Sequence, residues 1–167
     1  MSTVLKPELL TAEAFAPFGD VIEARGEPRG INYGATKRFH DLARIDCAAE
    51  DGRTVVNIFR SIPPVFPFDV KVMERHPLSS QAFVPLSGRP FLVVVAPKGP
   101  FDPAAIRAFR AAPGQGVNFA PGTWHHFNLA LEAQSDFLVI DREGPPVEDG
   151  GVNCDEVTLD PPPLLTP

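Results

Sequence analysis

The side chains best suited to chemistry in this chain lie in two short stretches, residues 74–81 and 116–127. The first stretch begins with Glu74 and includes His76, and the second contains His125. Imidazole and carboxylate groups carry protons in many enzymes, and both are ligands of divalent first-row metals. The two stretches therefore predict either general acid–base catalysis or a metal site.

Aromatic and β-branched residues flank these side chains, which predicts that strands position them. Side chains alternate between the two faces of a strand, so Glu74 and His76 should share one face. By the same rule His125 and His126 must point in opposite directions. We expect His125 to face a cavity and His126 to face the outside or a subunit interface. The alternative for His125 is a hydrogen-bonded, structural histidine in a turn.

The composition predicts a single, mainly β domain spanning residues 1–167. Twenty prolines and thirteen glycines leave little room for long helices and favour short strands joined by turns. Many short strands at regular spacing indicate a β-barrel or two-sheet jelly roll, a fold that can hold a small ligand in its mouth. We expect a helical turn capped by Thr11 and one short helix near 103–111, which Asp102 would cap and alanines fill.

Charge and hydropathy argue against several classes of partner. A net charge of −6 does not suit a nucleic-acid surface. The chain begins without an apolar signal segment, and its apolar runs are far shorter than the ~18 residues of a membrane span. Cys47 and Cys154 lack the spacing of a metal motif and do not form a disulfide framework. We expect a reduced, cytoplasmic protein that acts on a small molecule.

The two polar stretches resemble the two sequence motifs of cupins. Glu74 stands where the first cupin motif has its first histidine, His76 matches the second histidine, and Gln81 replaces a glutamate. His125 matches the histidine of the second motif. The resemblance implies a cupin-type barrel in which Glu74, His76, Gln81 and His125 could hold a divalent metal. Glutamine in place of glutamate removes one anionic ligand, which predicts weaker metal binding.

A second resemblance extends over nearly the whole chain. Several segments, in the same order, are similar to the ureidoglycolate lyase family of the cupin superfamily: residues 38–43, 74–83, 115–118, 124–126, 136–142 and 153–155. The resemblance implies a carbon–nitrogen lyase of purine (allantoin) catabolism that splits (S)-ureidoglycolate into glyoxylate and urea. It further implies a homodimer and a divalent metal, nickel or manganese.

The substrate's chemistry assigns roles to these residues. One carbon of ureidoglycolate bears a hydroxyl, a carboxylate and a urea nitrogen, so elimination needs a base, an acid and a cation for the carboxylate. We expect the catalytic residues to be His125, His76 and Glu74. The candidate substrate-binding residues are Arg38, His40, Arg60, Arg75, Gln81 and Trp124.

Several alternatives stay open on sequence alone. Acid–base catalysis without a metal would use the same side chains. The chain could be a non-catalytic cupin that binds small acids, or another metal-dependent cupin enzyme such as an isomerase or dioxygenase. Residues 37–43 could be an edge strand with a solvated, charged face. Sequence also does not separate a lyase, which releases urea, from an amidohydrolase, which releases ammonia and carbon dioxide.

Overall fold

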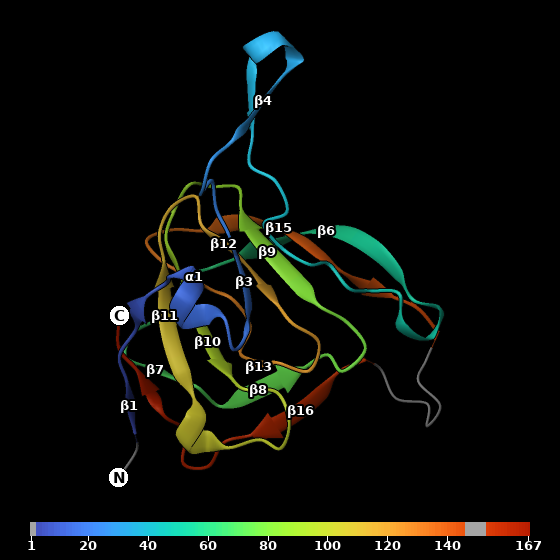
Figure 1. Cartoon of the computed structure of the whole chain (residues 1–167). Coiled ribbons are helices and arrows are strands. Elements are labelled where there is room, and N and C mark those ends of the chain that lie inside the picture. The colour runs from blue at the N-terminus through green and yellow to red at the C-terminus, as the bar shows by residue number, and fades with distance from the viewer. Residues whose placement is uncertain (1–2, 146–152) are drawn as a thin grey trace.

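Two main β-sheets pack face to face in the computed structural model, which describes residues 3–145 and 153–167 (Figure 1). The five-stranded sheet has the order β3 (Gly19–Ile22), β12 (Gly116–Phe119), β9 (Gln81–Pro85), β15 (Ser135–Glu143), β6 (Arg53–Ser61). The seven-stranded sheet has the order β16 (Asp155–Thr158), β8 (Val72–Arg75), β13 (Trp124–His125), β10 (Phe91–Ala96), β11 (Arg107–Ala111), β2 (Glu8–Leu9), with β14 (Leu129–Ala130) also paired to β10.

Smaller elements complete the described chain. A three-stranded sheet joins β1 (Val4–Leu5), β17 (Leu164–Leu165) and β7 (Phe68–Asp69), and a separate hairpin joins β4 (Arg29–Ile31) to β5 (Thr36–Arg38). The helical segments are α1 (Ala12–Phe15) and the 3₁₀ turns η1 (Asn32–Gly34), η2 (Ala49–Asp51) and η3 (Pro103–Ala105). The predicted mainly β, jelly-roll type of fold is confirmed. Within the described residues no helix is long and apolar enough to cross a bilayer.

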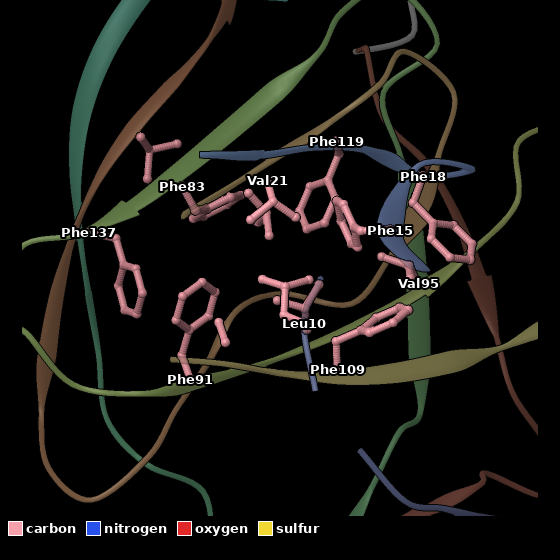
Figure 2. Packing of buried hydrophobic residues seen from close by; sticks show 14 of the residues in the cluster. Leu10, Phe15, Phe18, Val21, Phe83, Phe91, Val95, Phe109, Phe119 and Phe137 are labelled. Carbon is pink, nitrogen blue, oxygen red and sulfur yellow. The ribbon is translucent and has the colours of Figure 1, made fainter. Parts of the chain in front are cut away.

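Aromatic side chains fill the space between the two main sheets. Figure 2 shows Phe83 and Phe119 of the five-stranded sheet meeting Phe91 and Phe109 of the seven-stranded sheet. Phe15 of α1 packs edge-on against Phe109, with ring centroids 5.6 Å apart. A second apolar cluster lies on the other face of β10 and includes Leu92 and Val94. Strand β10 is therefore buried on both faces, as its unbroken apolar run predicts.

The predicted helix near 103–111 is wrong. Asp102 does cap a turn, because its carboxylate accepts the Ala104 amide, but that turn ends at Ala105. The following residues form β11, which pairs antiparallel with β10 along its whole length. Phe109 and Ala108 are buried on opposite faces, in the two clusters. Burial on both faces and pairing with β10 outweigh the helix propensity of the alanines.

Two other expectations have mixed outcomes. The helical turn capped by Thr11 is confirmed, since the Thr11 hydroxyl accepts the Ala14 amide at the start of α1. Residues 37–43 do not form one edge strand. Only the first two belong to β5, which pairs with β4 in an exposed hairpin.

Candidate active site

His76 is held in place by the backbone and side chain of Asn153. The backbone carbonyl of Asn153 lies 2.6 Å from Nδ1 of His76. The Asn153 side chain accepts a hydrogen bond from the Leu78 amide and donates one to the Ser79 hydroxyl. A carbonyl oxygen only accepts hydrogen bonds, so Nδ1 of His76 carries the proton. The other ring nitrogen, Nε2, is left with a lone pair.

His125 is positioned by its pairing with two strands and by one aromatic ring. It lies opposite Val95 of β10 and opposite Glu74 of β8, on the face that meets the core between the sheets. The Phe119 ring stacks on the imidazole with centroids 4.4 Å apart. Burial is the main cause that lowers the pKa of His125 to about 3, and the nearby His76 contributes less. The His125 ring is therefore neutral near pH 7.

The two imidazoles lie side by side with centroids 5.2 Å apart. Nδ1 of His125 lies 3.3 Å from the His126 carbonyl and 3.8 Å from a carboxylate oxygen of Glu74; both oxygens are acceptors, so Nδ1 carries the proton. Nε2 of His76 and Nε2 of His125 are buried and have no hydrogen-bond partner in the described chain, and the same holds for Oε1 of Gln81. Buried acceptors without partners are costly unless a proton donor or a metal meets them.

Glu74 completes this group. One ligand atom from each of Glu74, His76 and His125 lies within 4.8 Å of the others, so the three residues could hold a metal ion. The Cys154 thiol lies 3.8 Å from Glu74 Oε2, and burial together with the Glu74 charge raises the thiol pKa to about 11. Cys154 therefore stays protonated and can donate to Glu74. Sequence reasoning missed this contact because the two residues are far apart in the chain.

A polar recess of about 220 Å³ opens beside His76. Its lining residues are His76, Ser79, Gln81, Asp141, Arg142 and Asn153. Burial raises the pKa of Asp141, while hydrogen bonds from Gln81 and Asn57 oppose that shift. Asp141 is thus a candidate functional residue that the sequence analysis did not name, although it lies in a segment that resembles the family.

His126 points away from this group, as strand alternation predicts. It is buried rather than free on the outside: its Nδ1 donates to the Phe127 carbonyl at 3.0 Å, and Phe68 packs edge-on against its ring. Burial lowers the pKa of His126 to about 4. Its position beneath Phe68 corrects the expectation of an outward-facing side chain.

Two of the predicted substrate-binding residues lie on the wrong face of the seven-stranded sheet. Trp124 belongs to the second apolar cluster, where its indole donates to the Gly99 carbonyl. The Arg75 guanidinium lies 4.6 Å above the Trp124 ring and pairs with Asp155. Both neighbour site residues in sequence, but alternation turns them away from the recess. Trp124 and Arg75 are therefore structural neighbours of the site.

The remaining predicted substrate-binding residues divide in the same way. Arg60 is exposed and pairs with the half-buried Asp136 across β6 and β15. Arg38 and His40 are exposed, the first in β5 and the second just beyond it. Gln81 lines the recess as expected. The structure thus brings together Glu74, His76 and His125, places Gln81 with His76 in the recess lining, and leaves Arg38, Arg60 and Arg75 outside that lining.

A larger recess, of about 450 Å³, lies between the terminal segments. Its lining is mostly apolar and includes Leu5, Phe101, Ile106 and Leu159. Size alone would favour it as a ligand site. Proton transfer and metal binding require titratable groups. His76 and Asp141 line the smaller recess and His125 lies beside His76, so we take the smaller recess as the candidate active site.

The fold is that of a cupin-type protein, and its site combines Glu74, His76 and His125 with a polar recess that His76 and Gln81 line. The chain belongs to the ureidoglycolate lyase family, whose sequence model matches residues 2–166. A ureidoglycolate lyase of Burkholderia mallei (strain NCTC 10229) is 58% identical over 141 residues, which cover 84% of this chain and 83% of the relative.

Other relatives carry the same description. The ureidoglycolate lyase of Burkholderia cepacia is 52% identical over 159 residues, which cover 94% of this chain and 87% of the relative. That of Brucella anthropi is 57% identical over 138 residues, which cover 82% of each chain. The similarity thus includes both polar stretches that form the site.

The lowered pKa values of the buried histidines predict an acid-sensitive fold. The unfolded chain binds protons at a pKa near 6.5, so the free energy of unfolding should decrease as the pH drops below that value. At pH 5 each histidine should cost about 2 kcal/mol relative to pH 7.5. Urea denaturation of chelator-treated protein measures this loss, and His126→Gln should remove about half of it. A free energy of unfolding that is equal at both pH values would contradict the burial of His125 and His126.

Proposed function

We propose that this chain cleaves (S)-ureidoglycolate into glyoxylate and urea, as a carbon–nitrogen lyase. The observation that carries the proposal is a pair of imidazoles whose Nε2 atoms are buried and unpartnered, in a chain of the ureidoglycolate lyase family. Each Nε2 atom has a free lone pair, which can accept a proton or bind a metal ion. A site used only for stability would more often satisfy such atoms with protein donors.

The reaction breaks the bond between the central carbon and the urea nitrogen, and the hydroxyl oxygen becomes the carbonyl oxygen of glyoxylate. The hydroxyl loses a proton and the departing nitrogen gains one, so one group can carry that proton across. His125 and His76 each offer a lone pair at Nε2 for this transfer. The Glu74 carboxylate, near the Nδ1–H of His125, would stabilise the imidazolium that forms. Asp141 offers a further proton acceptor, made more basic by burial.

The same acceptors fit a divalent metal, for which we propose nickel or manganese. The residues that would hold it are Glu74, His76, Gln81 and His125, two nitrogen and two oxygen ligands of the kind that first-row metals accept. When bound, the ion would supply Lewis-acid polarisation of a substrate oxygen. Coordination would use the histidine lone pairs, and Asp141 would then carry the proton.

We also propose that the chain forms a homodimer. Val56 and Ile58 of β6 are 64% and 55% exposed, and Ile140 and Leu138 lie directly opposite them on β15. This apolar strip faces away from the core, and packing against the same strip of a second copy would cover it. A cytoplasmic location stays a prediction from the sequence.

Incubation of the purified protein with (S)-ureidoglycolate tests the proposed reaction. We expect glyoxylate and urea in equal amounts, a lower rate after chelation, and recovery of the rate with Ni²⁺ or Mn²⁺. Release of ammonia and carbon dioxide instead of urea would identify an amidohydrolase. Binding without turnover, with or without added metal, would identify a non-catalytic cupin and overturn the proposal.

The adjacent histidines provide a matched pair of variants. His125→Ala should lower kcat/KM by roughly 10²–10⁴, because it removes a proton carrier or metal ligand. His126→Ala should cost far less in rate and act through packing, since its ring lies beneath Phe68 on the other face. Steady-state kinetics on variants with native circular dichroism measure both. Equal losses of rate in the two folded variants would show that the face assignment is wrong.

A further inference from the structure

An exposed arm, residues 24–40, projects from the body of the protein (Figure 1). Every residue of β4, η1 and β5 within the arm is exposed, and Tyr33 at its tip is fully so. Its strands reach about 15–20 Å from Pro28 to Tyr33, at ~3.3 Å per residue. An isolated two-stranded hairpin is only marginally stable in water, so the arm should gain stability by contacting another surface.

Two arginines face each other on this hairpin. Arg29 and Arg38 are direct cross-strand partners, so their side chains leave the same face of the arm. Like charges in such a pair destabilise a hairpin unless an anion lies between them or nearby. Ile31 and Thr36, the next pair but one, share that face. The arm therefore presents a cationic face with one exposed apolar side chain.

The candidate active site needs a cation, whereas the arm presents two that are unpaired within the described residues. Its substrate is a carboxylate, and the side chains around the histidines include Glu74 and Asp141. Arg142 is the arginine that lines the recess, but its Nε and Nη2 already donate to the carbonyls of Ala49 and Glu50. Arg75 is paired with Asp155 on the other face of the sheet. Among the described residues that line the recess, the substrate carboxylate thus meets only Nη1 of Arg142, and no arginine offers it two free nitrogens.

Charge distribution indicates that the surface meeting the arm is a second copy of this chain. Residues 24–40 contain four basic side chains and one acidic one, whereas the rest of the chain contains 11 basic and 20 acidic side chains. The arm is therefore the basic part of an acidic protein and complements the body of a neighbouring copy. The exposed apolar strip of β6 and β15 gives that copy a surface on which to pack.

We propose that the arm of one copy docks on a second copy and that its Arg29 and Arg38 complete the second copy's active site by holding the substrate carboxylate. This inference rests on the proposed cleavage of ureidoglycolate, and it assigns Arg29 and Arg38 as the cations that bind the substrate carboxylate in that reaction. Arginine is suited to the task because its guanidinium binds a carboxylate through two parallel hydrogen bonds. Each site of the dimer would then be built from both copies.

Variants of the arm test whether it acts on the reaction. Arg29→Ala combined with Arg38→Ala should lower kcat/KM by roughly 10- to 100-fold, mainly through KM, since charge-assisted hydrogen bonds to the substrate are lost. Native circular dichroism of the variant would show that the body of the chain still folds. Arg25→Ala combined with Lys37→Ala removes the same charge from outside the Arg29–Arg38 face and should cost much less. Full activity of the Arg29/Arg38 variant would overturn the proposal.

A mixed dimer tests whether the arm acts between copies. One chain carries His125→Ala with an intact arm; the other carries the two arginine substitutions with an intact His125, and two different tags isolate the heterodimer. The heterodimer should have one complete site and about half of the wild-type kcat/KM, whereas each parent homodimer should have at most about a tenth of it. A heterodimer as inactive as its parents would show that the arm serves its own chain.

A second measurement does not depend on the reaction. Carbodiimide joins lysine to a carboxylate that it contacts, and a mixture of ¹⁴N- and ¹⁵N-labelled chains identifies links between copies. We expect Lys37 to be linked to an acidic residue of the other copy. Links confined to one copy, or sedimentation as a monomer at micromolar concentration, would overturn the docking. If the wild type does not cleave ureidoglycolate, the proposed function is wrong. The crosslinks of Lys37 would still show whether the arm contacts the other copy.

Discussion

The pairing of His125 with Glu74 across β13 and β8 is the constraint on which the site depends. It places an imidazole and a carboxylate on the inner face of one sheet, where burial keeps the imidazole neutral. Phe119 from the opposite sheet then covers the ring, so the aromatic core that holds the two sheets together also fixes the ring plane. A shift of β13 by one residue would turn His125 to the other face, away from Glu74.

Strand alternation explains why part of this site could be predicted from the sequence. The spacing of Glu74 and His76, and the adjacency of His125 and His126, depend only on the two-residue period of a strand. The fold class followed from short apolar runs separated by proline and glycine. These features are local, so a single sequence contains them. The motif spacing similarly pointed to Gln81, whose Oε1 atom is buried without a partner.

The features that could not be predicted depend on contacts between distant residues. The local alanine content indicated a helix at 103–111, but residues 107–111 of that segment pair with β10 as a strand. Trp124 is next to His125 in sequence and yet packs in a different apolar cluster. Asp141 gains its raised pKa from burial in the folded chain, which no local pattern reports. The need for a further cation likewise became evident only when Arg142, the arginine of the recess, could be assigned its hydrogen-bond partners.

The nitrogen chemical shifts of the histidine side chains test most directly whether His76 and His125 present unprotonated Nε2 atoms to one site. In ¹⁵N-labelled, chelator-treated protein at about pH 8, where an ordinary histidine is neutral, both rings should be Nδ1–H tautomers. On acidification to pH 5 His125 should remain neutral, because burial lowers its pKa to about 3. An Nε2–H tautomer for either ring, or a positively charged His125 at pH 5, would contradict the account of the site.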